Sequence, residues 1–250
     1  MKRLIGIVLV LALLCGAAAC ADEELDKILG DFVINHGSRQ LPKVAITVDD
    51  CYTLDYVWKI AELATEYGVH VTFFPIGIQL HEEDAEKWRA VVDQGHEIGC
   101  HNWAHANIGG VPTASVFKNL GRFQETLDEI LGYHYQIRWL RPPYGNLKDK
   151  DGHTYHGTTN VMRFGYEHIL LWDVSQTNPT KAIRQVKNGS ILLYHTNAKD
   201  FRCIEKLIPL LLEKGLEPVT VSELLETGPI ETSPEKYVYG QGRPAGEPED

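Results

Sequence analysis

The segment KVAITVDD, residues 43–50, decides the fold that this sequence predicts. Apolar and β-branched residues fill it as far as Val48, a pattern typical of a strand buried on both faces. Two adjacent acids, Asp49 and Asp50, end the strand. A helical pattern follows over residues 52–68 and stops at a glycine. A buried strand followed by an amphipathic helix predicts one βα unit of a parallel sheet.

The same unit recurs along the chain. Further strands are predicted at residues 69–77, 96–101, 137–145, 168–175, 190–196 and 216–221. Helices are predicted at residues 82–95, 113–133, 179–189 and 201–215, with a last turn at 222–226. Thr113 is the expected cap of the longest helix. This alternation predicts an α/β fold with a parallel sheet, and the number of strands favours a barrel.

Length and charge limit the possible partners. A chain of 250 residues suits one large α/β domain. The formal net charge is -10, with 34 acidic and 24 basic side chains, so the surface would repel nucleic acid and anionic lipid. We therefore expect no nucleic-acid partner, and we expect a monomer.

Residues 1–21 resemble a secretory signal peptide or a lipoprotein leader. Lys2 and Arg3 precede an apolar run and a group of small residues. Cleavage after Ala21 would release a soluble protein, whereas cleavage before Cys20 would leave a lipid anchor at that cysteine. An uncleaved anchor helix is a third alternative. All three place the protein in an extracellular or cell-envelope location.

The rest of the chain divides into three parts. We expect an N-terminal extension over residues 22–41, one domain over 42–228, and a disordered tail rich in Pro, Gly and Glu over 229–250. The domain contains an odd number of cysteines, so no disulfide framework follows. Cys51, Cys100 and Cys203 are expected to be small buried residues. A disulfide between Cys51 and Cys100 is the alternative.

Polar side chains follow successive predicted strands at the point where each strand ends. In βα barrels the reactive groups gather at the carboxyl ends of the strands. The residues in question are Asp49, Asp50, His101, His105, Arg141, Tyr144, Asp173, Ser175 and His195. We expect them to share one mouth of the barrel.

Three of these residues form a donor set that metals use. Two imidazoles and one carboxylate, here His101, His105 and Asp50, are a common zinc set that leaves one position open for water. Asp49 is placed to take a proton from that water, and His195 to give one to a leaving group. Singly, each motif has a simpler interpretation, such as a turn or a solvated loop; together they favour metal-assisted hydrolysis of an amide or ester.

Four motifs in this order identify a family. TVDD (47–50), HNWAH (101–105), RPPYG (141–145) and ILLYH (191–195) together resemble the polysaccharide deacetylase family, carbohydrate esterase family 4 or the NodB-homology domain. The resemblance covers residues 42–226. It implies a distorted (β/α)7 barrel that removes acetyl groups from N-acetylglucosamine polymers, or from acetylated xylan, with a divalent metal. Zn²⁺ is expected, with Co²⁺, Ni²⁺ and Mn²⁺ as alternatives.

The resemblance also implies a role for each site residue. Asp49 is the expected base, with Arg141 as its partner, and His195 is the expected general acid. Asp50, His101 and His105 are the expected metal ligands. The backbone N–H of Tyr144 would hold the oxyanion. The residues expected to contact substrate are Pro143, Tyr144, Trp172, Asp173 and Leu193.

The sequence departs from the family pattern at several positions. Cys51 replaces a glycine and is expected to crowd the substrate, whereas Asn102 replaces Ser or Thr and can still hydrogen-bond nearby backbone. Ser175 stands where the family has the acid that orients the arginine and the acid histidine, and Asp173 is the expected substitute. The polar insert at 146–160 is expected to be a lid or a cleft rim whose two histidines are solvated.

Three functions follow from these observations. The first is a deacetylase of peptidoglycan or a chitin-like polysaccharide. The second is an O-acetyl xylan esterase on the same fold, and the third is a catalytically weakened carbohydrate-binding relative. In each, the partner is an acetylated polysaccharide.

Overall fold

Strand β2 (Lys43–Asp50) is the centre of the fold. A computed structural model describes residues 27–237 of the chain. Every β2 residue from Val44 to Asp49 is buried, as the apolar pattern predicts. The strand pairs in parallel with β3 (Thr72–Pro75) on one edge and β8 (Ile191–His195) on the other.

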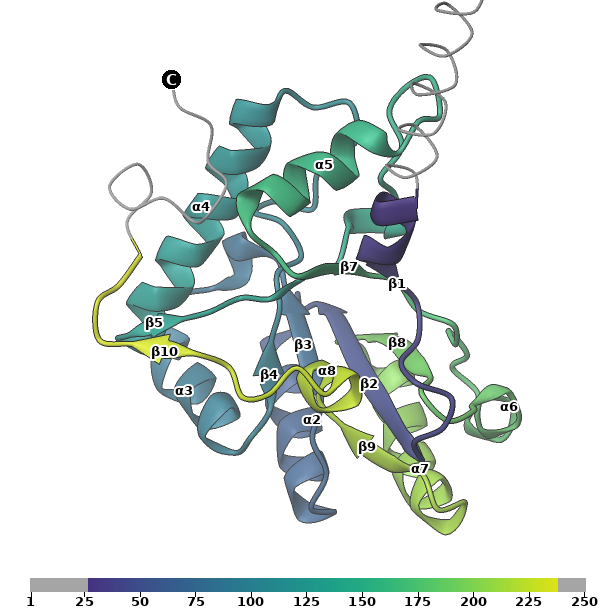
Figure 1. Ribbon diagram of the computed structural model, residues 1–250. Helices are drawn as coiled ribbons and strands as arrows, with labels where there is room; N and C mark the ends of the chain where they lie inside the picture. The colour runs from purple at the N-terminus through teal and green to yellow at the C-terminus, as the bar shows by residue number, and fades with distance from the viewer. Residues whose placement is uncertain (1–26, 238–250) are drawn as a thin grey trace, which may run out of the picture.

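The remaining strands complete an irregular parallel barrel (Figure 1). Strand β3 pairs with β4 (Glu97–Ile98), and β6 (Trp139–Leu140) pairs with β7 (His168–Leu170). Single parallel bridges join the segments between these pairs, Cys100 to Leu140 and Val174 to Leu192. Strand β9 (Glu217–Val219) pairs with the start of β2. The expected distorted (β/α)7 barrel is therefore confirmed.

Helices cover the outside of the barrel (Figure 1). Most were expected; they are α2 (Leu54–Glu66), α3 (Ala85–Asp93), α4 (Thr113–Leu131), α6 (Pro179–Gln185), α7 (Ala198–Glu213) and α8 (Val221–Leu225). Neighbouring helices pack against one another in the order α6, α7, α2, α3, α4, α5 (Tyr155–Phe164). Three short 3₁₀ turns, η1 (Gly77–Gln79), η2 (Glu82–Asp84) and η3 (Pro143–Gly145), shape the loops.

One local prediction about helices is wrong, and one helix was not predicted. Pro112 occupies the N-cap position of α4, and the Thr113 hydroxyl instead donates a hydrogen bond to Asn160. Helix α5 (Tyr155–Phe164) forms where the sequence suggested only a polar lid or rim. Its sequence is mostly polar, but one face of the helix is buried and includes Val161 and Phe164. Packing of this face against α4 stabilises the helix.

Both domain boundaries also differ from the prediction. Strand β1 (Val33–Ile34) pairs with β7, so the barrel includes residues before 42. Strand β10 (Thr232–Ser233) pairs with β5 (His134–Tyr135), so the segment 229–237 is ordered rather than a disordered tail. The leader with Cys20 and the final residues 238–250 lie outside the described residues. No helix within residues 27–237 is long and apolar enough to cross a membrane.

Candidate active site

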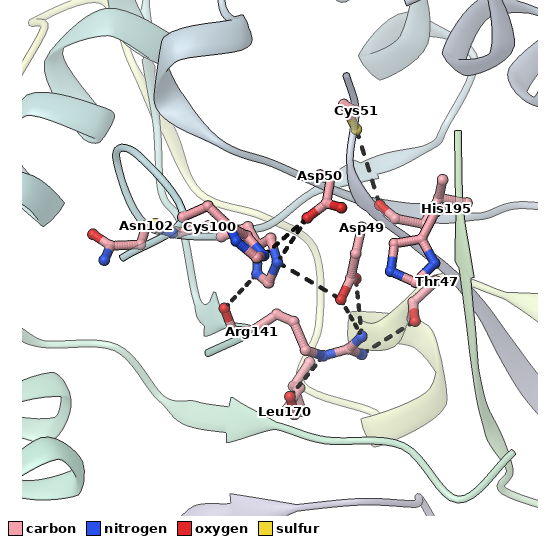
Figure 2. A network of polar contacts seen from close by, with 12 residues as sticks. Thr47, Asp49, Asp50, Cys51, Cys100, Asn102, Arg141, Leu170 and His195 are labelled. Carbon is pink, nitrogen blue, oxygen red and sulfur yellow. Dashed lines mark hydrogen bonds and ion pairs between the residues drawn. The ribbon is translucent and has the colours of Figure 1, made fainter. Parts of the chain in front are cut away.

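The predicted base, acid, arginine and metal ligands meet at the carboxyl end of the barrel strands (Figure 2). Asp49 and Asp50 end β2, and His195 ends β8 as the register partner of Asp49. The loop after β4 carries His101, and Arg141 directly follows β6. Residues far apart in the sequence are thus brought to one mouth, as the strand-end rule predicts.

Asp50, His101 and His105 form a compact cluster. The Oδ1 atom of Asp50 lies 3.1 Å from His101 Nε2 and 3.2 Å from His105 Nε2. One ligand atom from each residue lies within 4.8 Å of the other two. His101 Nδ1 donates a 2.7 Å hydrogen bond to the carbonyl oxygen of Arg141, because a carbonyl can only accept. In the neutral ring, Nε2 therefore directs a lone pair at the Asp50 carboxylate.

The charges of this cluster fit a divalent cation. Asp50 Oδ1 is buried and has no hydrogen-bond partner among the described residues. Burial opposes ionisation of Asp50, but the two imidazoles lower the pKa of its carboxyl. Burial also lowers the pKa of His105, which favours its neutral, ligating form. A buried carboxylate oxygen that faces two nitrogen lone pairs lacks a positive group, and a divalent metal would supply it.

The backbone around the cluster is strained. Within residues 27–237, six non-glycine residues have a positive φ, and five of them lie in or beside this site: Asp50, Cys51, Asn102, His105 and Tyr144. The left-handed conformation costs roughly 1–2 kcal/mol for such a residue. Strain of this kind persists where the surroundings hold a specific geometry, and it concentrates at functional sites.

Cys51 adopts a conformation that glycine reaches without strain, with a φ of 59°. Its side chain is fully buried in the apolar core beneath the site. The prediction that Cys51 crowds the substrate is therefore wrong, since the thiol faces the core. Burial, reinforced by Asp49 and Asp50, raises the pKa of this thiol, so it stays protonated.

The loop between the two histidines is held by its own side chains. Asn102 Nδ2 donates to the carbonyl of Ala106, and its Oδ1 accepts from the backbone N–H of Trp103, both at 2.8 Å. The expectation that Asn102 can bond nearby backbone is confirmed. The Trp103 ring packs so closely on Gly77 that a Cβ atom there would come within 2.3 Å of it. The Arg122 guanidinium lies over the Trp103 ring, 4.0 Å from its centroid.

Asp49 and Arg141 form a buried ion pair. Arg141 Nη1 donates to Asp49 Oδ1 at 2.9 Å and to Oδ2 at 3.1 Å. The remaining guanidinium hydrogens go to the Thr47 hydroxyl and to the carbonyl oxygens of Leu170 and Leu171. Burial lowers the pKa of Arg141, and the Asp49 carboxylate opposes that shift. Arg141 is thus oriented by backbone carbonyls and a hydroxyl, with no second acid.

Replacing Arg141 with methionine is expected to lower the free energy of unfolding by about 3–5 kcal/mol, because Asp49 would be left as an unpaired buried charge. Urea titration followed by circular dichroism measures this change. Arg39→Met is the matched control: Arg39 pairs with Asp173 at 2.7 Å near the surface, and its loss should cost less than about 1 kcal/mol. Equal losses for the two variants would contradict the prediction.

His195 has a carboxylate partner that the sequence analysis missed. Its Nδ1 atom lies 3.5 Å from Asp200 Oδ2. The interaction with Asp200 raises the pKa of His195, although burial opposes it, and Asp49 and Asp50 add to the rise. A signal for Asp200 did exist, since it is the first-turn acid of the helix that follows the His195 strand.

Four residues expected to contact substrate lie around the cluster. Tyr144 is 72% exposed, and its ring centroid lies 4.4 Å from that of His105. The Trp172 ring lies 5.4 Å from the Arg141 guanidinium. Leu193 is buried on the strand face that carries His195, and Pro143 is buried within η3. Their contacts with substrate stay predictions.

Asp173 is not where the sequence analysis expected it. Its carboxylate accepts hydrogen bonds from the Arg39 guanidinium, the Ser190 hydroxyl and the backbone N–H of Ile191. Ser190 and Ile191 lie at the start of β8, whereas His195 ends that strand. Asp173 therefore points to the opposite end of the barrel, and its expected roles in substrate binding and in orienting Arg141 and His195 are wrong.

The other cysteines and histidines of interest lie outside the cluster. Cys51, Cys100 and Cys203 are all free and buried, so the bridged alternative does not apply. Burial raises the pKa of Cys100 to about 12. His156 bonds the carbonyl of Val111, and so it is only partly solvated.

Comparison with known proteins places these features in a family context. The family model described as polysaccharide deacetylase matches residues 36–160. A peptidoglycan-N-acetylglucosamine deacetylase of Bacillus cereus is 26% identical over 206 residues, which cover 74% of this chain and 69% of the relative.

Solved structures share the fold. Bacillus subtilis PdaA, a family 4 carbohydrate esterase, has a TM-score of 0.69 at 21% identity, covering 82% of this chain and 88% of that one. A CE4 family pseudoenzyme from Bacillus anthracis has a TM-score of 0.67 at 22% identity, covering 77% of this chain and 68% of that one.

Proposed function

The chain belongs to the polysaccharide deacetylase family, and from this premise we propose that it is a metal-dependent hydrolase that removes acetyl groups from a polysaccharide containing N-acetylglucosamine. One observation carries the proposal. The buried Oδ1 atom of Asp50 faces the Nε2 atoms of His101 and His105 and has no hydrogen-bond partner among the described residues. Two imidazoles and one carboxylate are a donor set that catalytic zinc sites use.

Asp50, His101 and His105 would hold the metal, with Zn²⁺ as the expected ion. When bound, a divalent ion lowers the pKa of a water molecule and polarises the acetyl carbonyl. The residues of the chain supply the proton transfers and the orientation of the substrate.

Asp49 would act as the base that takes the proton of the attacking water. Arg141 donates two hydrogen bonds to that carboxylate and fixes its direction. His195 would donate a proton to the leaving amine from the other side of the mouth. The backbone N–H of Tyr144 would donate to the carbonyl oxygen as negative charge grows on it. Leu193 and Trp172 would enclose the acetyl group.

Peptidoglycan or a chitin-like polymer is the proposed substrate, and an extracellular or cell-envelope location follows from it. The named relative from Bacillus cereus, a peptidoglycan-N-acetylglucosamine deacetylase, supports this substrate class. The net charge of -10 also suits a neutral or partly deacetylated, cationic glycan better than an anionic polymer.

The test is acetate release. Protein stripped with a chelator and reloaded with Zn²⁺ is incubated with N-acetylated chito-oligosaccharides, with peptidoglycan and with acetylated xylan. Acetate is expected from an N-acetylated substrate only after reloading. Faster release from xylan would instead favour the O-acetyl esterase. Absence of acetate with every substrate, in protein that binds zinc, contradicts the proposal.

A carbohydrate-binding role without turnover is the second candidate. Ser175 stands where the family has an acid, and one protein of the same fold is a CE4 family pseudoenzyme. Calorimetry with chito-oligosaccharide would show binding without acetate release in that case.

A further inference from the structure

The connection between β8 and α7 brings a second carboxylate to the mouth. Only Thr196 and Asn197 separate His195 from the first residue of α7. Asn197 caps the helix, because its Oδ1 accepts from the backbone N–H groups of Lys199 and Asp200. The cap fixes the first turn of α7, and with it the Asp200 side chain, directly behind His195.

Asp200 contacts both the backbone and the ring of His195. Its Oδ2 atom accepts a 2.8 Å hydrogen bond from the His195 backbone N–H and lies 3.5 Å from Nδ1. The Asp200 side chain is 6% exposed, so the contact is shielded from water. The His195 side chain is 46% exposed. Nδ1 thus faces the protein, and Nε2 lies on the edge of the ring away from Asp200.

The neighbouring loop is also tied to this unit. The Thr196 hydroxyl accepts a 3.2 Å hydrogen bond from the backbone N–H of Thr53, which follows the Asp49–Asp50 pair. The strand end that carries the proposed base is therefore joined to the one that carries His195. A shift of either loop would change the distance between the two groups.

Resting on the proposed function, we propose that Asp200 is the positioning residue for His195, holding Nδ1 so that Nε2 presents the proton to the leaving group. Asp200 thereby orients His195 in place of the acid that the family has at the position of Ser175. It does so from helix α7 rather than from the strand end. Asp173, the alternative on the β7 side, bonds Arg39 and Ser190 at the far end of β8.

The charged groups that face His195 are Asp49 and Asp50 from β2, Asp200 from α7 and His105 from the loop after β4. Three of these are carboxylates, and Asp200 is the one in contact. Removing its charge should lower the pKa of His195, while the other two acids keep their places.

The test is Asp200→Asn in the zinc-loaded protein. We expect kcat to fall by about 10²-fold, at the lower end of a general acid's contribution, with KM little changed. The alkaline limb of the kcat/KM profile should move to lower pH. The titration of His195, followed by NMR, should move the same way. Asp55→Asn is the matched control, because Asp55 is also a first-turn acid of a barrel helix but is exposed and is not among the charged groups that face His195.

A double variant separates positioning from general damage. Asp200→Asn should have almost no further effect on kcat in a His195→Ala background, because the two residues act as one unit. Full additivity of the two losses, or an unchanged His195 titration in Asp200→Asn, would overturn the proposal. Should Asp200→Asn not fold, Asp200→Ser serves with the same expected direction, since serine suits a helix start.

The NMR titration does not depend on turnover. If the wild-type protein released no acetate but His195 still titrated at lower pH in Asp200→Asn, the proposed function would fail while the positioning contact stood. If the wild-type protein were active and the titration did not move, the positioning role alone would fail.

Discussion

Asp50→Ala is expected to abolish zinc binding and to lower kcat/KM at least ~10³-fold, since a catalytic metal supplies several kcal/mol of transition-state stabilisation. Asp50 contributes the only carboxylate of the three-residue cluster. His101→Ala and His105→Ala should lose metal and activity together for the same reason. Isothermal titration with Zn²⁺ and acetate release from a chito-oligosaccharide measure the two losses.

The control for these variants is His81→Ala, which removes an exposed imidazole. It should bind zinc and release acetate like the wild-type protein. A cluster variant that kept full activity after chelation would show that the metal is not held by Asp50, His101 and His105.

The fold was predictable because its main signal is repeated. Each buried strand reads as an apolar run, and each following helix reads as an amphipathic pattern ended by glycine or a polar turn. The elements that were not predicted have little such signal in their sequences. Strands β1 and β10 are two residues each, and α5 has a mostly polar sequence whose buried face is narrow. Their structure comes from pairing with distant segments, which a local pattern does not reveal.

The site could be predicted where a single motif indicates both the functional residue and the direction of its side chain. The end of β2 and the HNWAH loop predicted that Asp50, His101 and His105 lie together, and the structure does bring them together, because a strand end fixes where its side chains point. The prediction for Asp173 was wrong because the side-chain direction in an irregular strand does not follow from simple alternation along the sequence. The segment that carries it meets β8 at Ile191, near the start of that strand. Asp200 was not predicted because it reaches the site from the first turn of a helix, whereas the family pattern places the corresponding acid at the end of a strand.

Cys51 shows a related limit. Sequence comparison marks it as a bulky replacement for glycine, but only the backbone tells where the side chain goes. With a φ of 59°, the residue turns its thiol into the core. The fold tolerates the strain because Asp50 and the following turn are fixed by pairing with β3 and by the hydrogen bond from Ile76 to the Asp50 carbonyl.

Asp49→Asn is expected to separate turnover from metal binding. Asp49 is buried beside the cluster but is not one of its three ligand-bearing residues; its Oδ2 lies 4.0 Å from His101 Nε2. Zinc affinity should therefore stay close to that of the wild-type protein. Loss of the proposed base should lower kcat by about 10²–10⁴-fold, the usual contribution of a positioned general base. Calorimetry with Zn²⁺ and steady-state acetate release give the two quantities.

The comparison with Arg141→Met makes this result specific. Both substitutions break the same ion pair, so both should lower the melting temperature, and stability alone cannot account for a difference between them. Arg141→Met keeps the carboxylate that takes the proton, and Asp49→Asn removes it. A kcat for Asp49→Asn equal to or above that of Arg141→Met would mean that the carboxylate only balances the charge of Arg141. A kcat well below it would mean that the proton of the attacking water goes to Asp49.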